Sequence, residues 1–307
     1  MQSKQFHHPL VGGRSVFIHR WLPDGEAKSA VLIVHGMAEH GGRYARLAQA
    51  LTDAGHAVYA PDLPGHGRTV RAPDELGHVA DRGSWVTLLS AINAVRELIQ
   101  HERHDPPIYI LGHSMGSLLL QDYVVEHGHN LAGAIFSATT GDLGGLRAIA
   151  VTLVKAEALW YGRAHRSAVA GALTFKNFNR RYKPARTEFE WLSRDAAEVD
   201  KYVADPACGF SCSCALWIDL FTAGAGWTDP ERLARIPKNL PVLMIAGSDD
   251  PATRGEAGPR ALEQNYQQAG LRDVIVRIWP GARHELYNET CRDEVTAETL
   301  AWLNART

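Results

Sequence analysis

One serine in the chain has neighbours that suit it for nucleophilic chemistry. Ser114 lies at the centre of Gly112-His-Ser-Met-Gly116, a G-x-S-x-G pattern between a predicted strand and a predicted helix. A tight turn there exposes the serine hydroxyl, and small residues are needed at both glycine positions because neighbouring backbone passes close by. The turn also puts the Met115 amide at a helix N-terminus, where it can stabilise a developing oxyanion. The motif therefore predicts a nucleophile.

A serine hydroxyl is a weak nucleophile and needs a histidine base that a carboxylate orients. Asp249 and Asp250 follow a predicted strand in Gly247-Ser-Asp-Asp-Pro251, and His284 follows the last predicted strand. The order serine, acid, histidine is the one expected after such a turn. Pro251 biases Asp250 toward an extended conformation, which does not choose between the two aspartates. Each candidate alone is more often an ordinary turn or surface residue, so the prediction rests on their joint occurrence.

A second oxyanion donor is expected after the strand that ends in His35. Gly36 turns the chain there, and the backbone N–H of Met37 would face the Met115 amide across the site. The alternative is that Gly36 only permits a tight turn.

The elements that must position these residues alternate between short apolar runs and longer helical patterns, which is typical of an α/β fold with a mostly parallel sheet covered by helices. Predicted strands span 15–21, 30–35, 56–60, 108–111, 133–136, 241–246 and 273–278, and predicted helices span 44–54, 85–100, 117–126, 261–268 and 294–303. Pro61 is expected to end the third strand. Residues 139–227 break the alternation and are too long for a structureless loop, so we predict a helical insertion. The predicted core is then 1–138 and 228–307.

Composition excludes several classes of protein. The 307 residues (33.7 kDa) suffice for one large domain with an insertion, and 45% hydrophobic with 21% charged residues is ordinary for a globular chain. A formal charge of −2 gives no reason to expect nucleic acid as a partner. No apolar run approaches the roughly 20 residues of a membrane span, and the N-terminus lacks the apolar segment of a secretory signal.

Four cysteines are present, and they do not form the spread pattern of a disulfide framework. Cys208, Cys212 and Cys214 are crowded together, whereas Cys291 is distant. A reducing cytoplasm is therefore the expected location. The crowded three also invite a metal hypothesis, but no second ligand pair accompanies them, so we predict packed thiols and no metal site.

The sequence resembles the α/β hydrolases of the monoacylglycerol lipase and lysophospholipase type (serine aminopeptidase-like). The resemblance rests on His35-Gly-Met-Ala-Glu-His40 with Gly42-Arg-Tyr44, Asp62-Leu-Pro-Gly-His-Gly67, Gly112-His-Ser-Met-Gly116, Gly247-Ser-Asp-Asp250 and His284-Glu-Leu-Tyr-Asn-Glu289. It implies an α/β-hydrolase fold whose catalytic residues are Ser114, Asp250 and His284, with oxyanion amides on Met37 and Met115. It also implies that 139–227 is a cap shaping an acyl pocket, and that a serine esterase or lipase hydrolyses lipid monoesters through an acyl-enzyme, without metal or cofactor.

Four other functions are compatible with parts of the pattern to different degrees. A small-molecule carboxylesterase would use the same residues. A proline-iminopeptidase-type peptidase carries signatures resembling G-G-S-W-G and H-G-G-P-G, from which this chain departs, although Glu188 and Glu190 could bind an amino terminus. A non-catalytic ligand-binding protein of this fold would not need all three members of the triad. A haloalkane dehalogenase would need a carboxylate where Ser114 stands.

The insertion has a local excess of positive charge. Between Arg147 and Arg194 ten Lys or Arg stand against three acids, Glu157, Glu188 and Glu190. Helical spacing places apolar side chains on one predicted face: Leu146, Ile149, Ala150, Leu153 and Val154. One hypothesis is that this face makes a peripheral contact with a lipid surface. The alternative, which we favour for most of these residues, is that the stripe packs on the core. The sequence does not predict the oligomeric state.

Overall fold

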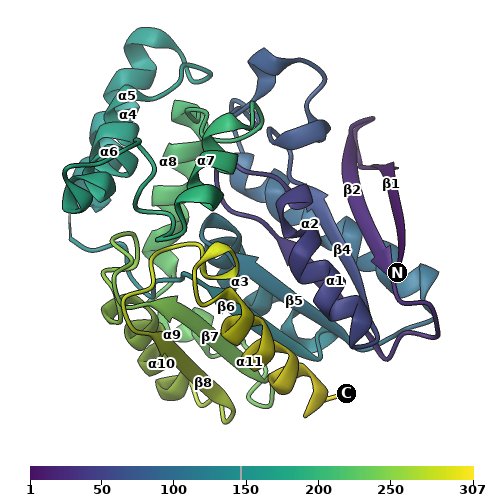
Figure 1. Cartoon of the computed structure of the whole chain (residues 1–307). Helices are drawn as coiled ribbons and strands as arrows, with labels where there is room; N and C mark the ends of the chain where they lie inside the picture. The colour runs from purple at the N-terminus through teal and green to yellow at the C-terminus, as the bar shows by residue number, and fades with distance from the viewer. Residues whose placement is uncertain (146) are drawn as a thin grey trace.

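The computed structural model describes residues 1–145 and 147–307 and contains an eight-stranded sheet (Figure 1). The strands are β1 (Gln2–Pro9), β2 (Ser15–Leu22), β3 (Ser29–Val34), β4 (His56–Asp62), β5 (Ile108–His113), β6 (Gly133–Ser137), β7 (Val242–Gly247) and β8 (Val274–Trp279). Their order is β1-β2-β4-β3-β5-β6-β7-β8. Only β1–β2 and β2–β4 pair antiparallel. The prediction of a mostly parallel α/β sheet is confirmed.

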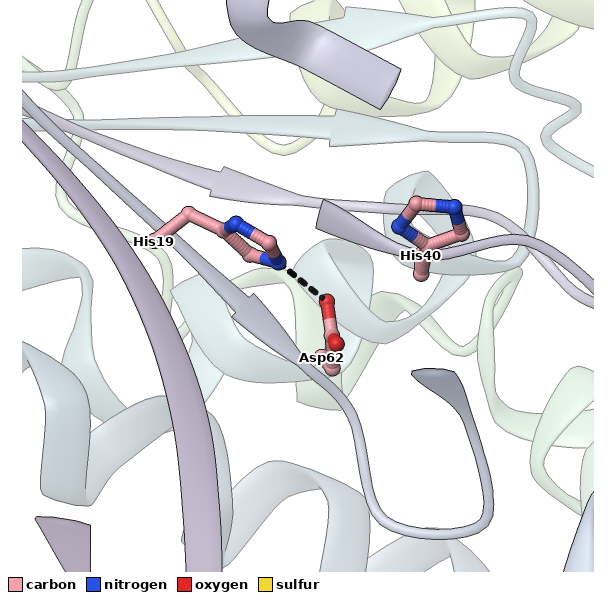
Figure 2. A group of neighbouring side chains, drawn as sticks. All are labelled: His19, His40 and Asp62. Carbon is pink, nitrogen blue, oxygen red and sulfur yellow. Dashed lines mark hydrogen bonds and ion pairs between the residues drawn. The ribbon is translucent and has the colours of Figure 1, made fainter. Parts of the chain in front are cut away.

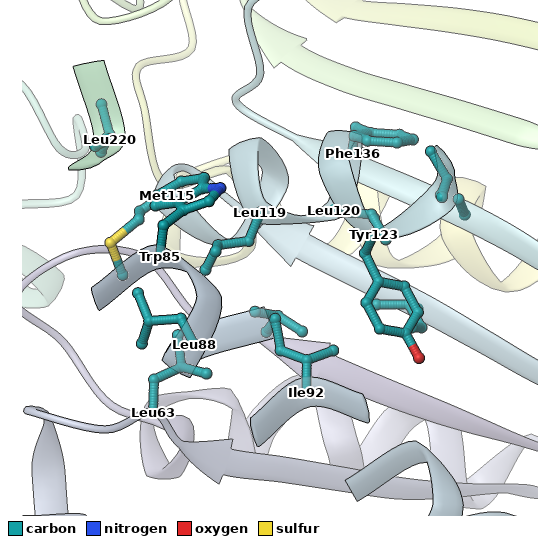
Figure 3. Packing of buried hydrophobic residues seen from close by; sticks show 14 of the residues in the cluster. Leu63, Trp85, Leu88, Ile92, Met115, Leu119, Leu120, Tyr123, Phe136 and Leu220 are labelled. Carbon is teal, nitrogen blue, oxygen red and sulfur yellow. The ribbon is translucent and has the colours of Figure 1, made fainter. Parts of the chain in front are cut away.

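Helices cover both faces of the sheet. On one face lie α1 (Ala45–Asp53) and α11 (Arg292–Asn304), and on the other lie α2 (Ser84–Glu102), α3 (Met115–His127) and α10 (Ala257–Gln268), while the short α9 (Pro230–Leu233) precedes β7. Side chains of β3 alternate between the two cores: Leu32 belongs to the α2/α3 core and Ile33 to the α1/α11 core. Figure 3 shows part of the α2/α3 core, including Leu88, Leu119 and Leu220. Burial on both faces explains the uninterrupted apolar runs of these strands.

One strand of the sheet was missed in the sequence analysis, and the end of another was placed wrongly. The exposed, polar strand β1 was not predicted, because its burial pattern lacks the alternation of a half-buried strand. The third predicted strand does not end at Pro61: β4 continues to Asp62, and Pro61 pairs with Ile18 of β2. The parallel partner β3 pairs with β4 only as far as Tyr59, so proline is tolerated beyond that point.

The segment between β6 and β7 is helical. It contains α4 (Arg147–Tyr161), α5 (Ala168–Leu173), α6 (Phe175–Asn179), α7 (Ala196–Ala204) and α8 (Cys214–Ala223). Helix α8 is buried and its side chains join the α2/α3 core, whereas α4 packs on α8 from outside (Figure 1). The boundaries 139–227 stay a prediction.

The predicted single apolar face of α4 is wrong. Ala150 and Val154 are buried, but Ile149 and Leu153 are 56% and 46% exposed. Leu146, the fifth residue of that prediction, lies outside the described residues. Ala150 and Val154 therefore form one stripe, which packs on the protein, whereas Ile149 and Leu153 form a second stripe, which faces solvent. No described helix is long and apolar enough to cross a membrane.

Candidate active site

Ser114 stands in the turn between β5 and α3 with φ 51° and ψ −118°, a backbone conformation that favours glycine. Its N–H donates to the carbonyl of Ser137 on β6 at 2.9 Å. Both glycines of the motif are sterically required. A Cβ at Gly112 would lie 2.5 Å from the carbonyl oxygen of Gly116, and one at Gly116 would collide with the carbonyl of Val34. The packing around the turn therefore explains the pattern G-x-S-x-G.

The structure brings Ser114, His284 and Asp250 into one hydrogen-bonded series. His284 Nε2 lies 2.9 Å from Ser114 Oγ, and His284 Nδ1 lies 2.8 Å from Asp250 Oδ2. The other carboxylate oxygen of Asp250 accepts from the N–H of Ala252 at 2.8 Å. Asp249 is not part of this series, because its half-exposed carboxylate faces Arg181 at 3.8 Å. Of the two candidate aspartates, the geometry thus selects Asp250.

The loops that carry the acid and the histidine are held side by side because β7 and β8 are adjacent parallel strands. Asp249 N–H donates to Ala282 O at 3.0 Å, and Gly281 N–H donates to Ser248 Oγ at 2.8 Å. A Cβ at Gly247 would collide with the carbonyl of Ala282. The close approach of these loops lets Asp250 reach His284.

The environment of His284 suits a base that becomes protonated during a reaction. Burial by itself would lower the pKa of His284, but the Asp250 carboxylate outweighs it and raises this pKa above its ordinary value. The ring of His113 lies 4.9 Å from that of His284. Burial, together with the charge that His284 can carry, lowers the pKa of His113 to about 4, so His113 is neutral near pH 7. The site therefore holds one histidine whose pKa is raised and one whose pKa is lowered.

Met37 and Met115, the predicted sources of oxyanion amides, line the same cavity as Ser114 and His284. Met115 is the first residue of α3, so its N–H has no acceptor within the helix. The neighbouring Gly36 N–H is occupied by Glu39 Oε1 at 2.6 Å. Glu39 is thus a residue next to the site that was not predicted from the sequence.

The cavity at Ser114 has a volume of about 110 Å³ and mostly apolar walls. The core contributes Leu118 and the insertion contributes Phe175 and Phe178 of α6 together with Trp217 and Leu220 of α8. Trp191, also from the insertion, packs its ring 4.7 Å from that of His284. The arrangement can accept an apolar group next to a serine nucleophile.

The other sequence candidates do not join this site. Glu190 pairs with Arg186 at 3.5 Å and Glu188 is exposed, and neither lines the cavity. An amino-terminus subsite made from these two glutamates is therefore not present at Ser114.

The three crowded cysteines are buried free thiols. Burial raises the pKa of Cys212 to about 12 and that of Cys214 to about 11. Of these three cysteines, only Cys208 belongs to a set of three potential metal ligands among the described residues, and its partners in that set are His40 and Asp205. The three cysteines are thus not gathered into one ligand set.

A second set of potential ligands, His19, His40 and Asp62, is better explained as a structural contact (Figure 2). Asp62 Oδ1 accepts from His19 Nε2 at 3.1 Å and from Gly41 N–H at 2.8 Å. Burial would raise the pKa of Asp62, but the hydrogen bond and charge of His19, together with the N–H of Arg68 and the charge of His35, lower it below its ordinary value. His40 uses both ring nitrogens, one toward Gly42 N–H and one toward Asp205. Asp62 therefore serves to fix the two strands and the loop that meet here.

A mostly parallel sheet with a serine at a strand-to-helix turn, followed along the chain by an acid and a histidine, defines the α/β hydrolases. Residues 25–291 match the serine aminopeptidase S33 family, and the chain belongs to this family. It is 28% identical to a monoacylglycerol lipase of Mycolicibacterium smegmatis, covering 95% of this chain and 94% of that one. It is 26% identical to a human monoglyceride lipase, covering 98% and 90%.

Solved structures agree on the fold. A thermostable carboxyl esterase from Bacillus coagulans, in complex with glycerol, superposes with a TM-score of 0.90 at 25% identity, covering 100% of this chain and 99% of that one. A soluble variant of a Saccharomyces cerevisiae monoglyceride lipase, in complex with a substrate analog, superposes with a TM-score of 0.79 at 20% identity, covering 100% and 96%.

Proposed function

We propose that this chain is a serine hydrolase of lipid monoesters, with monoacylglycerols as the first substrate class to test. The observation that carries the proposal is the hydrogen-bonded series Asp250–His284–Ser114 opening into an apolar cavity. Lysophospholipids are the other single-chain esters that fit this description. The names of the relatives, monoacylglycerol and monoglyceride lipases, support the same substrate class.

The proposed reaction proceeds through an acyl-enzyme. His284 Nε2 takes the proton of Ser114 as Oγ attacks the ester carbonyl, and Asp250 stabilises the imidazolium that forms. The N–H groups of Met37 and Met115 hold the negative oxygen of the tetrahedral intermediate. His284 then gives the proton to the leaving alcohol, and water repeats the sequence to release the fatty acid. Apart from the ester and water, each step uses only groups that belong to this chain.

The cavity favours a substrate with one acyl chain. Its walls are aromatic and aliphatic side chains from both the core and the insertion, so the hydrocarbon part of the substrate is removed from water there. We propose that residues 139–227 form the cap that shapes this pocket over a core of residues 1–138 and 228–307.

The test compares hydrolysis of a monoacylglycerol series, a lysophosphatidylcholine and short p-nitrophenyl esters by the wild type and by Ser114→Ala. We expect long-chain monoesters to be preferred and all activity to be lost in the variant. Activity on short esters alone would replace the lipid monoester with a small-molecule substrate. Unchanged activity in folded Ser114→Ala would overturn the assignment of the nucleophile.

We also propose that the insertion makes a peripheral contact with lipid surfaces. Large apolar side chains are exposed along α4, with Leu159, Trp160 and Tyr161 at 88%, 85% and 70% exposure. Lys155 is exposed on the same helix, and the basic residues Lys176, Arg180 and Arg181 are exposed nearby in the chain. Apolar side chains next to positive charge are what an anionic lipid surface attracts.

A further inference from the structure

Arg43 lies buried between two carboxylates that belong to different loops. Its Nη1 donates to Glu39 Oε2 at 2.6 Å and to Glu285 Oε1 at 2.7 Å, and its Nη2 donates to Glu285 Oε2 at 2.7 Å. The three side chains are only 11%, 3% and 6% exposed. We name this group the Glu39–Arg43–Glu285 bridge. The planar guanidinium holds Glu285 in a two-point contact, which fixes direction as well as distance.

One end of the bridge is attached to the loop that carries Met37. Glu39 Oε1 accepts from the Gly36 N–H at 2.6 Å and from the Tyr44 hydroxyl at 3.0 Å. Because Glu39 occupies the Gly36 amide, the next N–H along the chain, that of Met37, is the one left for the cavity. Ala38 has a φ of 57°, and its carbonyl accepts from the Tyr202 hydroxyl and from Gly209 N–H, each at 2.9 Å. The loop is thus held from both sides.

The other end of the bridge is attached to the loop that carries the histidine. Glu285 directly follows His284, and its own N–H donates to Leu192 O at 2.8 Å. Its Oε2 also accepts from Asn288 Nδ2 at 3.1 Å. Both the main chain and the side chain of Glu285 are therefore fixed next to His284.

We propose that Arg43 is a positioning residue that holds the Met37 amide and His284 in a fixed mutual geometry around Ser114. The inference rests on the proposed function. No member of the bridge lines the cavity, so the bridge does not contact a bound substrate there. It acts through the two loops that it joins, and the charges of Glu285 and Glu39 also help to raise the pKa of His284. Displacing a reacting group by about 1 Å costs on the order of 100-fold in rate, so a device of this kind has a measurable effect.

The chemistry of the bridge supports a geometric role. Buried ion pairs contribute little net stability, because desolvation offsets their attraction, and well-packed apolar residues serve stability as well or better. Burial alone would raise the pKa of Glu39, but the charge of Arg43, with smaller contributions from nearby histidines and the Gly36 N–H, lowers this pKa to about 2. Glu39 is therefore a fixed anion throughout the pH range of a histidine-dependent reaction. Within the bridge, Glu39 accepts from Arg43 and holds the Gly36 N–H and the Tyr44 hydroxyl in place.

The experiment compares the wild type with Arg43→Met, using one monoacylglycerol and one p-nitrophenyl ester. We expect kcat to fall by about 10-fold to 100-fold for both esters while KM changes by less than about twofold. Arg43→Lys keeps the charge but loses the two-point contact, and should restore only part of kcat. Arg20→Met is the matched control, because Arg20 of β2 is also a largely buried arginine and pairs with Glu102 at 2.9 Å without touching either loop that the bridge joins. We expect this control to keep wild-type kcat.

Arg43→Met leaves two buried carboxylates and can fail to fold, so Glu285→Gln is measured as well, with thermal melts of every variant. The rate at which a fluorophosphonate labels Ser114 gives a readout that needs no ester turnover. If the wild type hydrolyses neither ester, the proposed function fails, and the labelling rates still test the bridge. Unchanged kcat and labelling in a folded variant would overturn the inference. So would a rise in KM for the glyceryl ester alone, or an equal loss in Arg20→Met.

Discussion

Asp250 and Asp249 show how far residue types alone can locate a site. The motif and the chain order led to Ser114 and His284, but the conformational bias from Pro251 could not separate the two aspartates. The two aspartates differ in how deeply they are buried. Asp250 is completely buried against His284, whereas Asp249 points outward to Arg181. Which of two adjacent carboxylates turns inward depends on tertiary packing that a local pattern does not contain.

The pH dependence of the reaction follows from the raised pKa of His284. The histidine accepts a proton only when it is neutral, so kcat/KM falls as the pH drops through this pKa, which lies above 6.5. In Asp250→Asn the carboxylate that contributes most to raising the pKa of His284 is gone, while burial still lowers this pKa. The fall in kcat/KM should therefore move to lower pH, and kcat should drop by about 1,000-fold or more. The measurement is kcat/KM for a p-nitrophenyl ester against pH.

Asp249→Asn is the control for this prediction. Its carboxylate is half-exposed and does not touch His284, so the pH at which kcat/KM falls should stay at the wild-type value. An unmoved profile in Asp250→Asn, or an equal shift in both variants, would contradict the assignment of the acid.

The Glu39–Arg43–Glu285 bridge could not be predicted from the sequence. Glu285 is separated from Arg43 by 242 positions, and none of the three residues has a spacing that marks it as part of a site. A partial signal was present, because Glu39 and Glu285 stand inside the segments that carry the family resemblance, beside Met37 and His284.

At the scale of elements, prediction succeeded where a strand is buried on both faces and failed where it is not. The strands β3, β5 and β7 are fully buried and their apolar runs identified them. The exposed β1 has no such run, and its position depends on pairing with β2. In α4 the periodicity was real, but it could not show which stripe packs on α8 and which faces solvent.

Glu289 is the residue that joins the histidine loop, residues 280–291, to the insertion. Its fully buried carboxylate accepts from the main-chain N–H groups of Arg194, Arg283 and Thr290. It also accepts from Arg194 Nε at 2.9 Å. Replacing Glu289 by glutamine removes the negative charge. It also places an amide NH₂ group where the neighbouring groups are themselves N–H donors. We expect Glu289→Gln to lower the free energy of unfolding by about 3 kcal/mol, measured by urea denaturation.

The matching control is Glu298→Gln on α11. Glu298 pairs with Arg277 at 2.8 Å, but both side chains are partly exposed. We expect a loss of about 0.5 kcal/mol or less there. Equal effects of the two substitutions would show that Glu289 does not hold the loop.

For the molecule as a whole, the exposed apolar side chains of α4 predict binding to lipid vesicles. In flotation with anionic vesicles the wild type should rise with the lipid, and Leu159→Ser with Trp160→Ser should abolish this, because these side chains are the most exposed of the patch. Zwitterionic vesicles should bind less, since they do not attract the basic residues.

Val86→Ser serves as the control for a general loss of surface hydrophobicity. Val86 is 66% exposed but lies on α2 and not on α4, and the substitution should leave flotation unchanged. Negligible binding of the wild type to both kinds of vesicle would remove the proposed lipid contact while leaving ester hydrolysis untouched.

The hydrogen bonds between the insertion and the histidine loop are concentrated in one short stretch of the insertion. Main-chain groups of residues 190–194 carry these contacts: Glu190 O and Ser193 O accept from Arg283, Leu192 O accepts from Glu285 N–H, and Arg194 N–H donates to Glu289. Trp191, in the middle of this stretch, also packs on Phe175 and Phe178 of α6, which line the pocket. For protein engineering, this means that a substitution at Phe175 or Phe178 made to reshape the pocket also removes a packing partner of Trp191, whose ring lies 4.7 Å from that of His284.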